Sequence, residues 1–338
     1  MRKLNCLFLI FVLSCALPGS AAKLRQVAMI DLPGDPGFNQ VAMANGQVVI
    51  SRPGNNTIEI FSPVKRRVIA RISQIDNPRG LAVDAEGGRL FVALAGSNRV
   101  AVIDTKNWQV QELVPVQHKP EKLLWVPQTK TLYMTSTLDR TLSVVDARAG
   151  ESSVIELNGL PQDMIYDPGR RVLLLSLQDL NQVAAIGPDH RIAGTFKLMA
   201  NEPTGLALDN AHRRLYVAVR YAVVALNADT GQELSRVAAP GGTDTLILDA
   251  ESSLLYAAAG DGSVLAIDTN RNVVDHELPT NVRGYSIAYD PSHKMLFMPG
   301  GREGRSKMVI LRPVSALEPP PPATAQSPAA SEQTAMRK

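Results

Sequence analysis

The chain has 338 residues, with 35 lysines and arginines, 32 aspartates and glutamates, and a formal net charge of +3. This near balance provides no global field that would steer the chain toward nucleic acid or a membrane surface, so nucleic acid is not an expected partner. Phe, Trp and Tyr make up 5% of the residues, which argues against the exposed aromatic platforms that stack sugars or bases.

Residues 1–22 have the pattern of an export signal. Basic residues precede the apolar stretch 4–13, and small residues at 18–22 permit cleavage after position 22. The apolar stretch is too short to span a bilayer comfortably. An alternative is a bacterial lipoprotein, because the sequence VLSC ending at Cys15 resembles a lipobox. We therefore expect a periplasmic or secreted protein, attached to a membrane only if Cys15 carries a lipid.

Both cysteines, Cys6 and Cys15, lie inside this predicted signal. The rest of the chain has no thiol, which excludes disulfides, thiolate catalysis, Cys-ligated zinc and iron–sulfur clusters. Removing Arg2 and Lys3 with the signal leaves 33 basic and 32 acidic residues, a net charge of +1. The exported domain must therefore be stabilised by its core and by the closure of its fold.

A unit of about 40 residues recurs between Gly37 and Pro313. Its clearest copies read NPRGLAVD from Asn77 and NEPTGLALD from Asn201. Each copy divides short apolar runs of period two by turns rich in Gly, Asp and Asn, a pattern typical of four-stranded propeller blades. We predict an all-β, seven-bladed β-propeller, with units that start near Gly37, Asn77, His118, Gly159, Asn201, Gly241 and Asn281.

The last unit lacks an outer strand, because no strand pattern follows Pro313. The segment 25–32 precedes the first full unit and has the character of a spare outer strand. Its pairing with the last three strands would close the ring and leave no open blade edge. We therefore expect a monomeric propeller over residues 23–315. Residues 316–338 begin with a Pro-rich stretch and continue with Ala, Ser, Gln and Thr, which predicts a disordered tail.

Three short patterns recur in the units: P-x-G-L-A-V-D, G-R-L-(Y/F)-V-A and N-x-V-x-V-I-D. In these patterns the chain resembles the YVTN-type repeats of YncE-like propellers over nearly all of its predicted exported part. The resemblance implies an exported bacterial seven-bladed propeller with a DNA-binding role. The balanced charge of the chain does not support DNA binding. The third unit departs from the pattern, with Lys122 where Gly is usual and WVP at 125–127 in place of the Asp turn, so we expect altered local geometry there.

Most units place an aspartate near the end of the first strand, and several place another at the end of the third. A ring of carboxylates could bind calcium, but each of these residues precedes a turn in which an Asp side chain bonds its own backbone. No pair of histidines has metal-ligand spacing either, so we predict no metal site. We assign to turns Asp84, Asp167, Asp209, Asp249 and Asp290, together with Asp104, Asp146 and Asp268.

In a propeller, the turn before the first strand and the turn between the second and third strands lie on one face, around the central channel. Polar groups that converge on such a concave mouth indicate a binding site, although a water-filled channel would have the same lining. The predicted ligand is a small molecule or an envelope protein. Alignment of the units places one variable polar residue per blade at this mouth: Asn39, Arg79, Glu121, Gln162, Thr204, Asp244 and Tyr285.

Three arginines are expected at the rim of the same face. They are Arg220, Arg302 and Arg305. The Gly-rich segment 300–305 reads as a flexible loop that could present guanidinium groups to an anion.

Two enzymatic or redox alternatives remain open. His118, Glu121 and Arg79 together offer a base, a carboxylate and a cation, which is the minimum set for a lactonase-type hydrolase. The other alternative is an accessory subunit of a quinone-linked dehydrogenase system, but no cofactor ligand is recognised and no cofactor is expected. A Ser nucleophile elbow, a Walker loop and a dinucleotide fingerprint are all absent from the sequence. A binding module is therefore our leading prediction.

Overall fold

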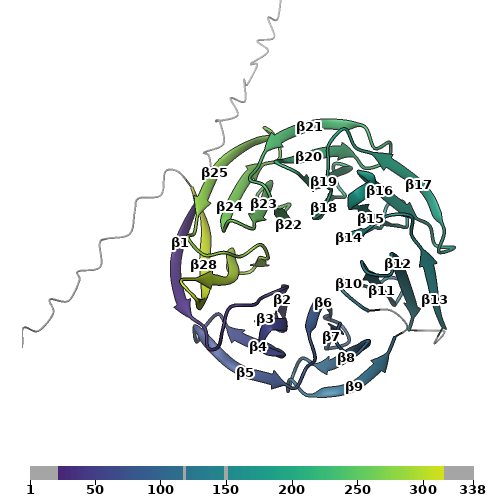
Figure 1. Ribbon diagram of the computed structural model, residues 1–338. Helices are drawn as coiled ribbons and strands as arrows, with labels where there is room; N and C mark the ends of the chain where they lie inside the picture. Colours follow the sequence, from purple (N-terminus) through teal and green to yellow (C-terminus); the bar gives the residue numbers. More distant parts are fainter. Residues whose placement is uncertain (1–21, 117–118, 148–150, 316–338) are drawn as a thin grey trace, which may run out of the picture.

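The computed structural model describes residues 22–116, 119–147 and 151–315. Residues 1–21 of the predicted signal, His118 and the predicted tail lie outside these ranges. The described residues form seven four-stranded antiparallel sheets, arranged as blades around a central axis (Figure 1). The prediction of an all-β, seven-bladed propeller is confirmed.

The blades are numbered in chain order, and each begins at its innermost strand. Blades one to three contain β2 (Val41–Ala44), β3 (Gln47–Arg52), β4 (Thr57–Ser62), β5 (Arg67–Ser73), β6 (Pro78–Asp84), β7 (Arg89–Leu94), β8 (Arg99–Asp104), β9 (Val110–Pro115), β10 (Leu123–Val126), β11 (Thr131–Ser136), β12 (Thr141–Asp146) and β13 (Glu151–Glu156). Blades four and five contain β14 (Pro161–Asp167), β15 (Val172–Leu177), β16 (Gln182–Ile186), β17 (Ile192–Lys197), β18 (Leu206–Asp209), β19 (Arg214–Val219), β20 (Ala222–Asn227) and β21 (Glu233–Ala238). Blades six and seven contain β22 (Thr243–Asp249), β23 (Leu254–Ala259), β24 (Ser263–Asp268), β25 (Val273–Pro279), β26 (Ala288–Asp290), β27 (Met295–Arg302), β28 (Arg305–Ser315) and β1 (Ala22–Asp31).

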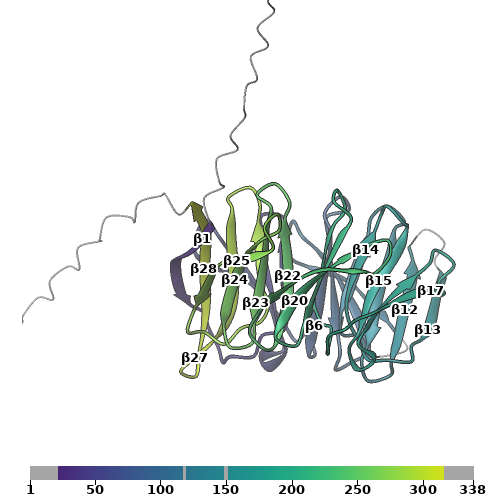
Figure 2. The same cartoon turned by 90° about the horizontal axis from the view of Figure 1, so that it is seen from above.

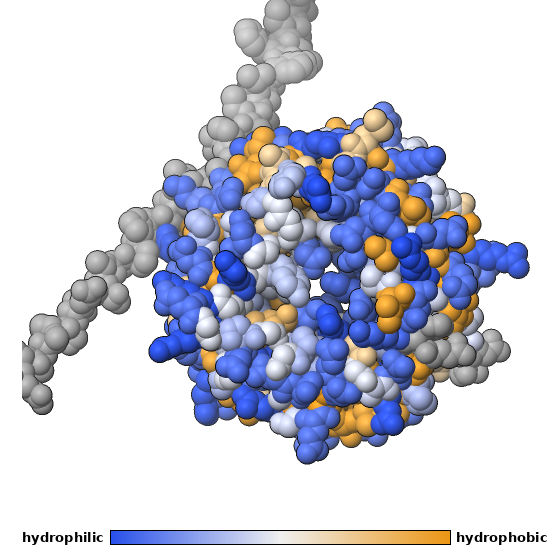
Figure 3. All heavy atoms as spheres, viewed as in Figure 1, coloured by the Kyte–Doolittle hydropathy of each residue, from blue (hydrophilic) through white to orange (hydrophobic). Residues whose placement is uncertain are grey.

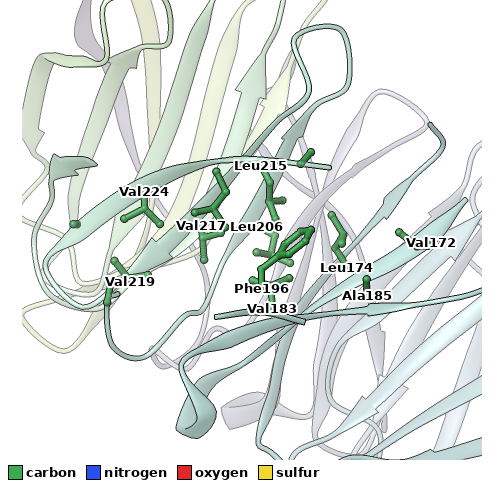
Figure 4. Close-up of a cluster of buried hydrophobic side chains, with 14 residues drawn as sticks. Val172, Leu174, Val183, Ala185, Phe196, Leu206, Leu215, Val217, Val219 and Val224 are labelled. Carbon is green, nitrogen blue, oxygen red and sulfur yellow. The ribbon is translucent and has the colours of Figure 1, made fainter. Parts of the chain in front are cut away.

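Neighbouring blades cover both faces of each blade, and this sets the burial of its strands. The second strand β7 is buried at nearly every position, whereas the outer strand β5 alternates exposed and partly buried residues. Figure 4 shows one interface between blades, in which Leu174 and Phe196 of the fourth blade pack with Leu206 and Val217 of the fifth. The hydrophobic core therefore lies between the blades, and the channel at the axis is left to polar groups.

The ring is closed by the pairing of its first strand with its last. β1 runs antiparallel to β28, from Ala22 opposite Ser315 to Asp31 opposite Lys307, and the two lie side by side in Figure 1. The spare outer strand predicted at 25–32 is therefore present, and it begins three residues earlier. Blade six holds it as well, because the Asp275 carboxylate accepts the Ala22 N–H at 2.8 Å.

A fully buried ion pair stands beside this closure. The guanidinium of Arg52 lies 2.8 Å from the Glu59 carboxylate, and neither side chain is exposed at all. The same guanidinium donates to the carbonyl oxygens of Pro33 and Asp35 and, at 2.9 Å, to the Ser306 hydroxyl. Arg52, in the first blade, thus hydrogen-bonds both the segment that joins β1 to β2 and Ser306 of the last blade.

Seven of the eight recurring aspartates belong to turns, as the sequence predicts, and the turn predicted after Asp146 extends into residues outside the described ranges. The Asp84 carboxylate accepts the Gly87 N–H at 3.0 Å, and that of Asp268 accepts the Asn270 N–H at 2.8 Å. Corresponding bonds to backbone N–H groups are made by Asp104, Asp167, Asp209, Asp249 and Asp290. These carboxylates are used by the scaffold and are not free to bind a ligand.

The third unit keeps regular blade geometry. Its innermost strand β10 pairs with β11 in unbroken register, from Leu123 opposite Met134 to Val126 opposite Thr131. Trp125 fits into the interface by packing on Phe91 of the second blade, with ring centroids 5.2 Å apart. The expectation of altered local geometry is wrong, because the larger residues are accommodated by side-chain packing.

We expect Arg52→Met to lower the free energy of unfolding by about 3 kcal/mol, because it leaves the Glu59 carboxylate buried with one fewer cation. Urea unfolding followed by tryptophan fluorescence measures the change. The double variant Arg52→Met/Glu59→Met should recover at least half of the loss, since no fully buried charge remains and Arg71, the other partner of Glu59, is 42% exposed. The control Lys65→Met, at an exposed position, should stay within about 0.5 kcal/mol of wild type. A single variant as stable as wild type would contradict this role.

Candidate functional site

The seven predicted mouth residues occupy one structural position in all seven blades. Each lies two residues before the first core residue of its innermost strand. In six blades this core residue is paired with the second strand: Val41 opposite Ile50, Leu81 opposite Val92, Leu123 opposite Met134, Met164 opposite Leu175, Leu206 opposite Val217 and Leu246 opposite Ala257. In the seventh blade the core residue is Ile287, and the pairing begins at the next residue, Ala288 opposite Phe297. We call Asn39, Arg79, Glu121, Gln162, Thr204, Asp244 and Tyr285 the mouth ring.

The residue that follows each mouth-ring residue, which we call the junction position, meets the next blade. At three of the seven junctions its side chain accepts the backbone N–H of the first core residue in the following blade. These bonds are Val41 N–H to Ser286 Oγ (3.1 Å), Leu81 N–H to Gln40 Oε1 (2.8 Å) and Leu206 N–H to Asp163 Oδ2 (2.9 Å). Polar side chains at this position therefore join blades around the channel.

At two other junctions the position is glycine, and the blades approach each other by their backbones. A Cβ atom added to Gly80 would lie 2.3 Å from the carbonyl oxygen of Glu121, and one added to Gly205 would lie 2.1 Å from that of Asp244. Real Cβ atoms do not come this close, so both junctions require glycine. This explains why the clearest copies of the repeat have Gly at this point.

Lys122 occupies the third junction position, and its side chain crosses the channel. Its ammonium Nζ lies 3.6 Å from Asp244 Oδ2, which belongs to the sixth blade. β10 begins directly after Lys122, β22 contains Asp244, and the two strands face each other across the centre in Figure 1. Burial lowers the pKa of Lys122, but the carboxylates of Asp244 and Asp163 outweigh it and raise the pKa, so the side chain is a cation at neutral pH. Sequence analysis noted the residue as a departure from the repeat but did not identify its role.

The carboxylate of Asp163, from the fourth blade, lies in the same part of the channel. Burial raises its pKa, and the charge of Lys122 opposes that rise in part. A cavity of about 220 Å³ surrounds these groups, and its lining includes Lys122, Asp163, Asp244 and Ser286. The channel centre therefore holds one cation and two carboxyl groups in a confined polar space.

A larger hollow of about 830 Å³ opens at the mouth between the sixth, seventh and first blades. Its lining includes Asn39, Tyr285, Arg283 and Arg302, of which Arg283 is not a sequence-predicted residue. The Asn39 amide donates to the Tyr285 hydroxyl at 3.4 Å, and that hydroxyl donates to the Phe38 carbonyl at 3.3 Å. Figure 3 looks along the ring axis and shows the channel opening surrounded mainly by hydrophilic residues.

The other mouth-ring residues lie apart from this hollow. Thr204 lines a second hollow of about 490 Å³ together with Arg220. There the Arg220 guanidinium is paired with the Glu202 carboxylate, Nε to Oε2 at 2.9 Å. The Gln162 amide donates to Gln178 at 3.1 Å.

Arg79 and Glu121 come from adjacent blades but are not joined in the described structure. The Arg79 guanidinium donates to the Asn77 side chain at 3.3 Å, and neither residue has an ion pair within residues 22–116, 119–147 and 151–315. His118, the third member of the predicted hydrolase set, lies outside these ranges. The described residues thus supply a cation and a carboxylate at the mouth but no assembled set of catalytic groups.

The prediction of a flexible loop at 300–305 is wrong. Arg302 ends β27 and Arg305 begins β28, paired directly with each other. The turn between them consists of Glu303 and Gly304, both with positive φ (51° and 73°), which is the backbone conformation that tight two-residue hairpins require. Figure 2 shows β27 reaching the lower edge of the disc, where this hairpin lies. Arg302 lines the large hollow, whereas Arg305 does not.

No protein-family model matches the chain, and no curated protein matches its sequence. Among solved structures, hydrazine synthase of Kuenenia stuttgartiensis is similar, with a TM-score of 0.72 and 15% sequence identity. The similarity covers 82% of this chain and 96% of that chain. At this identity the likeness shows the fold alone. The chain is a β-propeller.

The described residues contain no helix long and apolar enough to cross a membrane. Nor do these residues bring together three or more His, Cys, Asp or Glu side chains that could hold a metal ion.

We expect Gly205→Ala to destabilise the protein by about 1–3 kcal/mol, because the new methyl group would overlap the Asp244 carbonyl of the next blade. Gly194→Ala is the matched control. Its Cβ would meet nothing within 4 Å, so it should be neutral or stabilising by up to about 1 kcal/mol. Thermal and urea unfolding of the two variants measure the difference. Equal stabilities would show that the blades have room to separate at the channel.

Proposed function

We propose that this protein is an exported bacterial binding module that holds a small polar ligand at the channel mouth. The observation that carries the proposal is the hollow of about 830 Å³, in which polar side chains of the first and seventh blades converge. Its walls include the β27–β28 hairpin and the segments that lead into the innermost strands of the first and seventh blades. The bond from the Val41 N–H to Ser286 Oγ joins these two segments, so part of the lining is held in place before binding. A concave polar hollow of this kind favours a small molecule over a flat protein surface.

The export part of the proposal is supported by the sequence. A basic start, a short apolar stretch and small residues before position 23 form a signal pattern, and the remaining 316 residues have no cysteine. Lipidation of Cys15 is the alternative route to the same compartment. The similarity of the repeats to YncE-like proteins supports a periplasmic location as well.

The test is capture of a small molecule by the full-length protein. Purified protein is incubated with the small-molecule fraction of a bacterial envelope extract, separated by gel filtration and denatured, and released compounds are identified by mass spectrometry. We expect at least one polar compound to be enriched. Tyr285→Ala combined with Arg283→Ala should reduce its enrichment at least tenfold, because both side chains line the hollow.

Lys106→Ala is the matched control, because this exposed lysine lies in the turn between the third and fourth strands of blade two, on the opposite face of the disc. It should bind the compound as wild type does. Enrichment that is unchanged in the Tyr285/Arg283 variant but lost in the control would place binding on the other face and reject the proposal. Failure to enrich any compound would reject it too.

A further inference from the structure

The charged groups at the centre of the channel are not satisfied by one another. Lys122 and Asp244 are separated by 3.6 Å, whereas a tight ammonium–carboxylate pair has N···O distances of about 2.7–2.9 Å. The two groups therefore form a long ion pair, which is weaker than one at hydrogen-bond distance. About a quarter of each side chain is exposed, 25% and 24%. Both groups therefore retain donors and acceptors for something else in the channel.

The chemistry of these groups limits what that can be. A simple anion would be attracted by Lys122 but repelled by Asp244 and Asp163, and a simple cation would meet the opposite arrangement. An uncharged ligand that displaced water would leave both charged groups without partners, which is costly. A molecule with an ammonium and a carboxylate close together satisfies the two groups at once. It would lie between the two side chains, with its ammonium facing the Asp244 carboxylate and its carboxylate facing the Lys122 ammonium.

The surroundings of the pair add room and a neutral phenol. Burial and the nearby carboxylate of Asp244 raise the pKa of Tyr285, so its phenol is protonated at neutral pH. Ser286 lines both the central cavity and the large hollow, so the two spaces adjoin. A ligand anchored at Lys122 and Asp244 could therefore extend a side chain of variable size into the mouth.

We propose that the channel mouth binds a free α-amino acid, with its ammonium group on Asp244 and its carboxylate on Lys122. The proposal rests on the function proposed above and names the chemical class of the ligand. A zwitterion carries no net charge, so its binding leaves the charge of the site unchanged, and Asp163 stays beside Lys122 as it is in the free protein. Arg283 and Arg302, at the wider part of the hollow, lie where the side chain of the amino acid would extend.

The experiment measures the thermal shift of the full-length protein with each of the twenty free amino acids, followed by calorimetry on those that raise the melting temperature. We expect at least one to bind. Its N-acetyl and its carboxamide derivatives, which each lack one charge, should bind at least tenfold more weakly. Acetate and methylammonium, alone or mixed, should produce no shift at the same concentration. These comparisons change only the ligand and do not depend on the folding of any variant.

Variants then locate the contacts. Lys122→Met should weaken binding of the free amino acid at least tenfold and abolish the discrimination against the carboxamide, since the carboxylate loses its partner. Asp244→Asn should do the same for the N-acetyl derivative. Lys106→Met, far from the channel, should change neither. If no amino acid binds, or if the derivatives bind as well as the parent compound, the proposal is overturned. A different compound released from the envelope extract would then leave the binding function standing without this ligand class.

Discussion

The structure depends on one constraint, which is that both faces of every blade must be covered by another blade. No sheet in an open row could satisfy this at its two ends, so the ring must close. Closure is achieved without a disulfide by pairing β1 with β28 and by the buried Arg52, which donates to the connecting segment and to Ser306. The free energy of the fold is therefore concentrated at interfaces between blades and at one seam.

The same constraint determines what can enter the channel. At the junction position the blades are so close that few residue types fit. The position is glycine at Gly80 and Gly205, whereas at Gln40 and Asp163 a polar side chain accepts the N–H of the next blade. Lys122 follows neither rule, because its side chain leaves the junction and reaches the opposite side of the lumen. The cation at the channel centre thus comes from the blade that breaks the repeat, and the two carboxyl groups come from blades four and six.

The fold could be predicted almost completely from the sequence, because period-two strands, Asp turns and a 40-residue repeat are local signals that seven copies reinforce. The positions of the mouth ring could also be predicted, since they follow from alignment of the copies. Contacts across the channel could not. Nothing local relates Lys122 to Asp244, 122 residues later in the chain. The glycines at 300, 301 and 304 favour a flexible loop, but two of them lie in β27 and only Gly304 lies in the two-residue turn.

The charged centre is difficult to explain by stability. Removing two charges from water is costly, and pairs in confined surroundings repay that cost only with short distances and additional hydrogen bonds. The pair of Lys122 and Asp244 lacks the short distance, and Asp163 adds a carboxyl group whose raised pKa reflects the same cost. Five of the other six junctions use glycine, serine, threonine or glutamine, so an uncharged centre is compatible with this scaffold. A loosely paired cation and carboxylate, held in place by strand ends that the fold needs, are what a binding site for a charged ligand requires.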